Sequence, residues 1–238
     1  MSYCTTQGIV LRSHEYREND RILTLLTPER GRVSVTLRGC RKIKSPLMAA
    51  GALFTMGEFV TFKGKGHELV TSFTLGDSFY PLRSGITLLT YASLLLSAAE
   101  AAAQEEEKAE HLFILLARSL TRLSYGEYPA DAVTAAYLIH LSQIEGFKPR
   151  LNHCVACGKT LAAADGGWLD AESGGLKCGE CAGGLPGYLR LTPLQIGWLR
   201  DILVRGVDKV AAIPDPPLMP LVRYAEYHLG RKLPEIIL

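Results

Sequence analysis

Cysteine is the residue type with the clearest chemistry in this 238-residue chain, because four of its six cysteines occur as two pairs. Cys154 and Cys157 form one Cys-x-x-Cys turn, and Cys178 and Cys181 form a second one after a loop of twenty residues. Each turn can aim two sulfurs at one point, so together they supply the four thiolates of a tetrahedral metal site. The spacing therefore predicts a structural metal site, with zinc expected and iron as the alternative.

The same four cysteines are also compatible with a pair of disulfides or with a thioredoxin-like redox pair. A redox pair, however, is normally one Cys-x-x-Cys in a βαβ setting. We expect Gly158 and Gly179 to take positive φ, which lets the backbone curl around a metal. His153 adjoins the first pair and could replace a thiolate, but four cysteines already complete the set.

The surroundings of the cysteines favour a structural role over nucleic-acid recognition. Acidic side chains there balance the lysines, which leaves little net positive charge for a phosphate backbone. The loop is rich in Gly and Ala and has almost no apolar residues of its own, so a single metal would order a segment that lacks a core.

No pattern in the sequence specifies an enzyme. His14 with Asp20, or His67 with Glu68, can be imagined as acid/base pairs, but none of the six histidines has the spacing of a nucleophile or metalloprotease motif. The run at 63–66, Lys-Gly-Lys-Gly, lacks the frame of a phosphate-binding loop. A four-cysteine site also leaves no open coordination position for a water molecule, so a protein without enzymatic activity is predicted.

Lysine and arginine gather in the first third of the chain. Residues 1–80 hold eleven Lys and Arg against seven Asp and Glu, whereas residues 81–153 hold six against eight, within a net charge of only +2. Such cations on strand faces and loops can follow the phosphates of DNA. The predicted DNA-binding residues are Arg12, Arg17, Arg32, Arg38, Arg41, Lys42, Lys44, Lys63 and Lys65.

The alternative for this basic set is a solvated surface of mixed charge, with Glu15, Glu18 and Glu29 as partners. Aromatic residues for stacking on bases are sparse, because strand alternation places several of them in a core. We therefore expect binding through the DNA backbone that tolerates any sequence and weakens with salt. The aromatic residues in question are Tyr16, Phe54, Phe59, Phe62 and Phe73.

Short strands are the elements expected to position these cations. The pattern indicates a polar connection at 14–20 and a short helix near 47–50. Within 32–38 strict alternation puts Val33, Val35 and Leu37 on one face. Five strands with a small helix after the third predict a barrel of the OB-fold type. The predicted strands are 8–11, 21–27, 32–38, 55–63 and 68–79.

From residue 81 onward the apolar residues repeat with helical period, and Thr192 with Gln195 forms a capping box before a later helix. The fold class is thus α+β and multidomain, with an OB-fold barrel, a helical body and an embedded four-cysteine zinc finger. The predicted ranges are 1–80 for the OB-fold, 81–151 for the first part of the helical domain, 152–187 for the zinc-finger insertion and 188–238 for the second helical part.

The remaining cysteines, Cys4 and Cys40, have no evident partner, which suits a reducing cytoplasm. The sequence opens without a signal peptide pattern, and no run of eighteen apolar residues occurs. We therefore expect a cytoplasmic protein that has no membrane partner.

Four N-terminal segments form a distinctive combination of motifs: GIVLRS at 8–13, YRENDRI at 16–22, TPERGR at 27–32 and RGCRK at 38–42. In combination they resemble the RecO family of bacterial DNA repair proteins. The GFKP run at 146–149, which leads into the two cysteine pairs, is similar to the members that bear zinc. The likeness extends over essentially the whole chain.

The resemblance implies an N-terminal OB-fold, a helical body and one structural zinc ion. It implies a recombination mediator that binds single- and double-stranded DNA and anneals complementary strands in the cytoplasm, at the nucleoid. Its partners would be RecR, the acidic C-terminal tail of single-strand binding protein (SSB) and, indirectly, RecA. The alternative is a zinc-stapled adaptor that binds other proteins and makes no direct contact with DNA.

Overall fold

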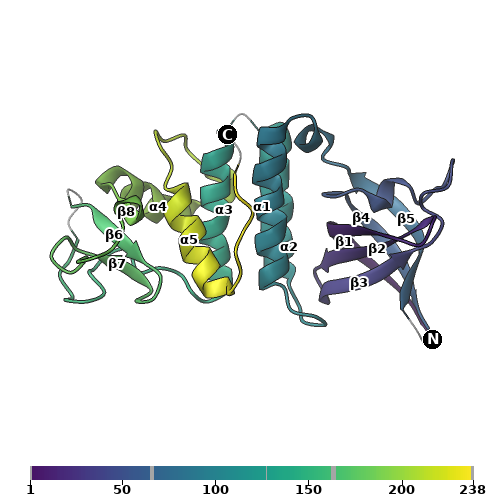
Figure 1. The fold of residues 1–238 in the computed structure, drawn as a ribbon, viewed down its shortest axis with the longest axis horizontal. Coiled ribbons are helices and arrows are strands. Elements are labelled where there is room, and N and C mark those ends of the chain that lie inside the picture. The colour runs from purple at the N-terminus through teal and green to yellow at the C-terminus, as the bar shows by residue number, and fades with distance from the viewer. Residues whose placement is uncertain (1, 65–66, 127, 162–164, 237–238) are drawn as a thin grey trace. The chain divides into compact units, whose positions relative to one another are not determined.

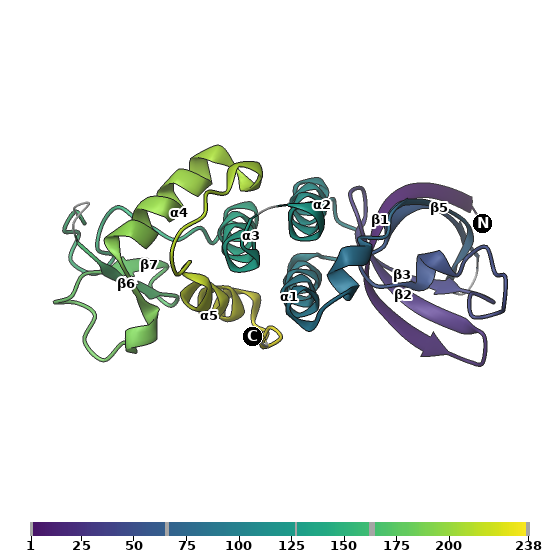
Figure 2. The same cartoon turned by 90° about the horizontal axis from the view of Figure 1, so that it is seen from above.

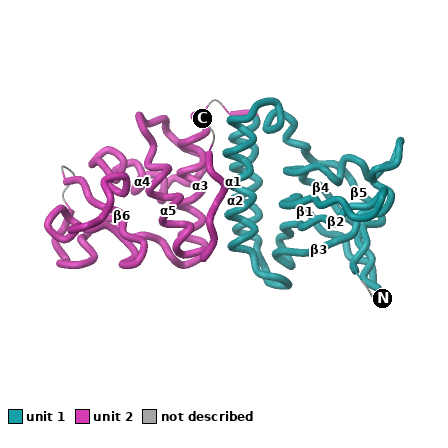
Figure 3. The backbone as a smooth tube through the Cα atoms, viewed as in Figure 1, with its two compact units in different colours: residues 1–124, 237–238 teal, residues 125–236 magenta. Residues whose placement is uncertain are grey.

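The structure is a computed structural model that describes residues 2–64, 67–126, 128–161 and 165–236. Its contacts divide the chain into two compact units, one of residues 1–124 with 237–238 and one of residues 125–236 (Figure 3). The division falls inside the predicted helical body, at the end of its second helix. The four predicted domain ranges stay a prediction, because packing contacts do not say which ranges fold on their own.

A closed five-stranded barrel begins the first unit (Figure 1). The strand order is β1-β2-β3-β5-β4, and β1 closes the barrel by pairing antiparallel with β4. The β3–β5 pair is parallel, and a 3-10 helix, η1 (Ala49–Gly51), follows the third strand. This is the predicted OB-type arrangement. The strands are β1 (Ser2–Tyr16), β2 (Asp20–Thr27), β3 (Gly31–Leu37), β4 (Met56–Lys63) and β5 (Glu68–Asp77).

Alternating apolar side chains form the barrel core. Val33, Val35 and Leu37 are buried with Leu23 and Phe59, as the alternation in β3 predicted. A β-strand sends successive side chains to opposite faces, so Ser34 and Arg38 on the same stretch are exposed.

The first strand is longer than predicted, and the expectation of a connection at 14–20 was wrong. Residues 2–9 pair with β4 and residues 9–16 pair with β2, so only 17–19 form the turn. A bulge between Val10 and Arg12 bends β1 from one neighbour to the other. The 14–16 segment is polar because all three of its side chains are exposed, not because the strand has ended.

Two helices complete the first unit. A 3-10 helix, η2 (Tyr80–Arg83), leads into α1 (Ile86–Ala102), and α2 (Glu110–Tyr125) lies beside α1 (Figure 2). The segment between them docks on the β2–β3 turn, where the Arg32 N–H donates to Gln104 O and the Ala109 N–H donates to Pro28 O, both at 2.9 Å. Gly31 has φ +59, and a Cβ there would lie 2.3 Å from Gln104 O. Only glycine permits this close approach.

The second unit combines helices with a small antiparallel sheet of order β7-β6-β8. Pro129 immediately precedes its first helix, and Ile144 at the end of that helix is exposed. The helices are α3 (Ala130–Ile144), α4 (Pro193–Arg205) and α5 (Leu218–Leu229), with 3-10 helices η3 (Gly187–Leu189) and η4 (Val207–Lys209). The strands are β6 (Gly167–Asp170), β7 (Gly175–Lys177) and β8 (Arg190–Leu191).

The capping box at the start of α4 is confirmed. The Thr192 hydroxyl accepts a hydrogen bond from the Gln195 N–H at 3.2 Å, and the Gln195 carbonyl Oε1 accepts one from the Thr192 N–H at 2.8 Å. We expect Thr192→Ala to lower the free energy of unfolding by about 1 kcal/mol, because it leaves a helical N–H without its acceptor. Urea unfolding checks this, with Thr192→Ser as the control that keeps the cap. A Thr192→Ala protein as stable as the parent would show that the cap contributes nothing.

Candidate metal centre and nucleic-acid interface

Four sulfurs meet in the second unit, as the spacing predicted. The Sγ atoms of Cys154, Cys157, Cys178 and Cys181 all lie within 4.8 Å of one another, and those of Cys157 and Cys178 are 3.8 Å apart. A tetrahedral ion with Zn–S bonds of about 2.3 Å requires sulfurs about 3.8 Å apart, so the donor set fits a metal. All six cysteines of the chain are free, which sets aside the two-disulfide alternative.

Local backbone turns aim the sulfurs inward. In the first turn Gly158 has φ +75 and its N–H donates to Cys154 O at 2.9 Å. In the second turn, which directly follows β7, the N–H of Cys181 donates to Cys178 O at 3.0 Å. Gly158 behaves as predicted, but Gly179 is not at positive φ, so that part of the prediction was wrong. The second turn closes without a glycine at positive φ, and the presence of Gly179 in the sequence does not show which conformation it adopts.

The electrostatics of the cluster favour a cation at its centre. Burial raises the pKa of the Cys154 thiol, but N–H groups of Cys157, Cys178 and Ala156 outweigh burial and lower that pKa to about 6. The Cys178 N–H lies 3.3 Å from Cys154 Sγ. Hydrogen bonds with Cys157 and Cys178 raise the pKa of Cys181 to about 12, so the thiols do not all ionise without a positive charge between them.

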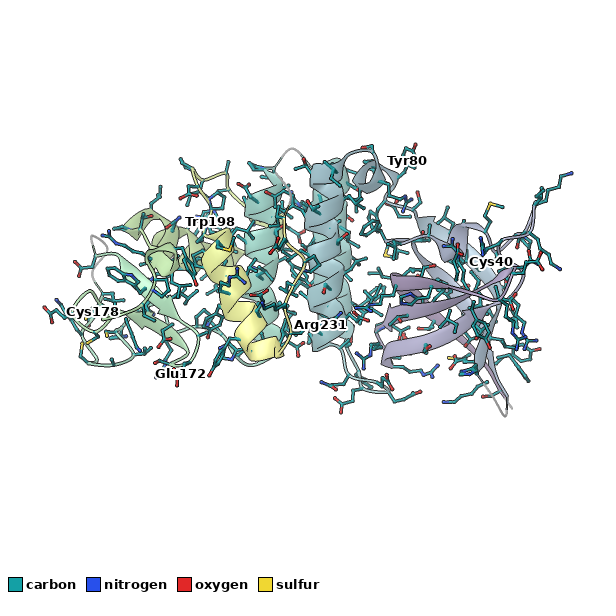
Figure 4. All side chains as sticks on the ribbon, in the orientation of Figure 1. Cys40, Tyr80, Glu172, Cys178, Trp198 and Arg231 are labelled. Atoms are coloured by element: carbon teal, nitrogen blue, oxygen red, sulfur yellow. The ribbon has the colours of Figure 1, made fainter. Side chains whose placement is uncertain are left out.

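The loop that carries the cysteines has more core than predicted. Leucines of β6 and β7, together with Leu161 and Leu191, are buried around the sheet (Leu169 and Leu176 are the strand residues). Its leucines are few, but the sheet brings them together into a small buried core. The expectation that this segment has almost no apolar residues with which to form a core was therefore wrong. Cys178 lies in this small module (Figure 4), and His153 is exposed and outside the sulfur cluster, as predicted.

The second unit also has a groove that the sequence did not reveal. Its volume is about 840 Å³, and its described lining holds no carboxylate. Apolar side chains of Leu151, Val155, Leu203 and Val204 contribute to its wall. The basic or imidazole side chains of the lining are Lys148, Arg150, His153 and Arg200.

Three residues of the predicted basic set are held by carboxylates of the first unit. Arg12 Nε lies 2.7 Å from the carboxylate of Glu100 on α1, and the Arg32 guanidinium lies 3.2 Å from Glu105. Lys63 Nζ lies 3.4 Å from Glu106. These cations therefore help to join the barrel to the helices of its own unit. Lys65 falls outside the described residues.

The other five predicted cations gather at one edge of the barrel, at the β1–β2 turn and the loop after β3. The Arg41 N–H donates to Asn19 O at 3.2 Å and the Gly39 N–H donates to Asp20 Oδ1 at 2.8 Å, which ties the loop to the turn. Arg41 also forms an ion pair with Glu15 at 3.1 Å, but the other four form none with described residues. We call this surface the basic edge: Arg17, Arg38, Arg41, Lys42 and Lys44, all exposed.

A buried charge network lies in the first unit, and sequence reasoning missed it. The Arg30 guanidinium donates two hydrogen bonds to Glu68, at 2.9 and 3.0 Å, and two to Glu106, at 3.0 and 2.7 Å. The Thr61 hydroxyl donates to Glu68 Oε1 at 2.6 Å. Glu68 is only 7% exposed and so depends on these partners. Glu68 and Asp20, the acids of the two imagined acid/base pairs, are both engaged elsewhere.

No helix within the described residues is long and apolar enough to cross a membrane. This finding agrees with the absence of a long apolar run in the sequence.

Comparisons with known proteins cover nearly the whole chain. The family model described as "Recombination protein O N terminal" matches residues 1–79, and the one described as "Recombination protein O C terminal" matches residues 83–235. The chain is 32% identical over 237 residues to the DNA repair protein RecO of Anaeromyxobacter sp. (strain K), covering 95% of this chain and 91% of that protein.

Two further relatives carry the same description. The DNA repair protein RecO of Alkaliphilus metalliredigens (strain QYMF) is 29% identical over 233 residues, covering 95% of this chain and 94% of that protein. The DNA repair protein RecO of Acetivibrio thermocellus is 31% identical over 192 residues, covering 81% of this chain and 76% of that protein. With both family models and these relatives in agreement, the chain belongs to the RecO family of DNA repair proteins.

Proposed function

We propose that this protein is a recombination mediator without enzymatic activity, which binds single- and double-stranded DNA and anneals complementary strands. In this proposal it acts with RecR to load RecA onto strands coated by SSB, in the bacterial cytoplasm at the nucleoid. The observation that carries the proposal is the basic edge, where five exposed cations meet on an OB-type barrel. A cluster of this kind attracts a phosphate backbone by releasing its counterions.

Annealing requires two strands close together with their charges screened and their bases free to pair. Contacts to phosphate provide the screening and leave the base edges open. This needs no nucleotide and no covalent step. Within the proposal the basic edge holds the strands, whereas Arg12, Arg32 and Lys63 keep to their carboxylate partners and Lys65 stays a predicted contact.

We assign the metal of the four-cysteine cluster as one structural zinc ion. All-sulfur tetrahedral sites are typical of zinc or iron, and a site closed by four cysteines suits a structural ion. The ion would hold the two cysteine turns together and so order the 152–187 insertion on its small sheet. Metal analysis of the purified protein by mass spectrometry tests the assignment, with iron as the result that would contradict it.

The groove of the second unit suits the acidic tail of SSB. Its lining holds Lys148, Arg150 and Arg200 beside apolar Val204 and no described carboxylate, so its charge complements that of an acidic peptide. The same groove favours the second candidate function, a zinc-stapled adaptor that binds proteins and not DNA. One measurement distinguishes the two candidate functions. A mediator retains DNA at low salt, whereas the adaptor does not.

Neutralising part of the basic edge tests the proposed function. We expect the double variant Arg38→Ala/Lys42→Ala to bind single-stranded DNA about tenfold more weakly at low salt and to anneal complementary oligonucleotides more slowly. Each lost phosphate contact should also lower the slope of log affinity against log salt by about 0.7. Fluorescence anisotropy at several salt concentrations measures both quantities.

The matched control changes the same amount of charge elsewhere. Lys209 and Lys232 are exposed residues of the second unit, and Lys209→Ala/Lys232→Ala should leave affinity and slope unchanged. Equal loss in both double variants would mean that net charge alone matters. Absence of DNA binding and annealing by the parent protein would rule out the mediator and leave the adaptor.

A further inference from the structure

Ile43 is the most exposed large apolar side chain of the described residues, at 90%. It lies within the basic edge, between Lys42 and Lys44. Single exposed apolar residues are common on protein surfaces, so exposure alone indicates no role. What distinguishes Ile43 is the way the loop around it is built.

The loop is held in place by its backbone. The Lys42 N–H donates to Gly39 O at 3.2 Å and the Ser45 N–H donates to Lys42 O at 3.0 Å, so Ile43 lies inside the second of two consecutive hydrogen-bonded turns. Lys44 follows it at φ +67, a left-handed conformation that non-glycine residues avoid. The backbone therefore holds Ile43 outward at some conformational cost, and a residue that is 90% exposed recovers little of that cost through packing.

The β1–β2 turn on the same edge repeats this construction. Arg17 has φ +55, again left-handed, and its guanidinium lies 5.2 Å from the centre of the Tyr16 ring, which is 38% exposed. Hydrogen bonds through Asn19 and Asp20 join the turn to the loop. The basic edge thus presents apolar surface among cations that have no ion-pair partner within the described residues, apart from the pair between Arg41 and Glu15.

The charge of the basic edge selects a polyanion, and the apolar side chain selects among polyanions. Duplex DNA surrounds its bases with stacked neighbours and phosphates, whereas single-stranded DNA exposes base faces and edges. An apolar side chain can touch a thymine methyl group in an intact major groove, but it packs against the face of a base only where that base is unstacked or becomes so. We propose, resting on the proposed function, that Ile43 packs against unstacked bases while the surrounding cations hold phosphates. Ile43 then makes the barrel prefer single-stranded over double-stranded DNA.

Three DNA ligands of equal length test this inference: a single strand, its duplex, and a single strand of abasic sites. Burial of part of an Ile side chain predicts that Ile43→Ala binds the base-bearing single strand about fivefold to tenfold more weakly. Affinity for the abasic strand and the duplex should stay unchanged, and so should the salt dependence. Ile43→Trp should bind the single strand more tightly than Ile43→Ala, because an indole stacks on bases. Fluorescence anisotropy gives all of these affinities.

Ile86 supplies the matched control, because it is the same residue type, is 58% exposed and lies on α1, outside the basic edge. Ile86→Ala should leave all three DNA affinities unchanged. Thermal melts check folding, which neither substitution of an exposed side chain should disturb.

Several results would overturn the inference. One is an Ile43→Ala protein that binds the base-bearing strand normally, and another is an equal loss on the abasic strand. A third is an Ile43-dependent affinity for an acidic peptide or for anionic vesicles without any dependence on bases. If the parent protein binds none of the DNA ligands, the proposed function itself fails. If the parent binds DNA and Ile43→Ala binds it equally well, only the inference about Ile43 fails.

Discussion

Cys178→Ser is expected to abolish metal binding and to unfold the small sheet module of the second unit. Cys178 directly follows β7, and its sulfur lies 3.8 Å from that of Cys157, so its loss removes one of four ligands and the link to the sheet. A structural zinc site stabilises a fold by several kcal/mol, up to about 10–16 kcal/mol in isolated finger peptides. The expected results are loss of the bound metal ion and a lower melting temperature, measured by mass spectrometry and calorimetry.

Cys4→Ser is the matched control for this loss. Cys4 lies on β1 of the barrel, outside the sulfur cluster, so the metal content and melting temperature should stay those of the parent. DNA binding per folded molecule should largely survive in Cys178→Ser, because the basic edge belongs to the other unit. A folded Cys178→Ser protein that no longer binds DNA would make the metal module part of the DNA interface.

Arg30→Met is expected to lower the free energy of unfolding by about 3–5 kcal/mol, because it leaves a buried carboxylate without its ionic partner. Glu68 would retain only the hydroxyl of Thr61 as a hydrogen-bond donor in its side-chain network. The double variant Arg30→Met/Glu68→Gln should recover much of the loss, because it removes the unpaired charge. Urea unfolding at neutral pH measures all three proteins.

An exposed ion pair provides the comparison for Arg30. Arg205 pairs with Asp201 at 2.7 Å with both side chains largely exposed, so Arg205→Met should change the free energy of unfolding by less than about 0.5 kcal/mol. If Arg30→Met were as mild as Arg205→Met, the buried network would be stabilising nothing.

The same network predicts an acid limit to the stability of the first unit. Hydrogen bonds from Arg30 lower the pKa of Glu106 to about 2; burial raises the pKa of Glu68, but hydrogen bonds from Arg30 and Thr61 outweigh burial and lower it. A carboxyl whose pKa is lowered by folding stabilises the fold above its unfolded pKa of about 4.3, and that contribution disappears as the pH falls.

In Arg30→Met only Thr61 and Lys63 would oppose burial, so the pKa of Glu68 should rise from its value in the parent, and the variant should gain less stability than the parent as the pH rises. The stability gap between parent and variant should therefore narrow from pH 7 to pH 3. Unfolding curves at several pH values measure this difference in the free energy of unfolding. A difference that does not change with pH would show that Arg30 does not alter the pKa of Glu68.

The four-cysteine cluster could be predicted because its information is local. Two Cys-x-x-Cys turns specify their own geometry, and only their meeting had to be inferred. The barrel was likewise predictable from the alternation of strands such as β3 and from the count of strands. The length of its first strand could not be predicted. The bulge near Val10 lets one long strand pair with two neighbours, and the polar stretch at 14–16 has the composition of a loop.

The partners of charged residues could not be predicted, because they depend on tertiary distance. Arg30 is separated from Glu68 by 38 residues and from Glu106 by 76, and no periodicity links them. Of the nine cations predicted to bind DNA, the structure pairs Arg12, Arg32 and Lys63 with carboxylates of α1 and the segment after it. A count of charges along the chain cannot separate these cations from those of the basic edge.

The segment that docks Gln104 against Gly31 is synthesised after the barrel that it covers. The strands of the barrel are complete once the ribosome has passed Asp77, whereas the segment that covers the β2–β3 turn is complete only at Ala109. At about 5–20 residues per second, a nascent chain spends roughly a few seconds between these points. When the strands of the barrel are complete, Arg30 therefore has Glu68 as its only carboxylate partner in this network. It gains its second partner, Glu106, as the helices emerge.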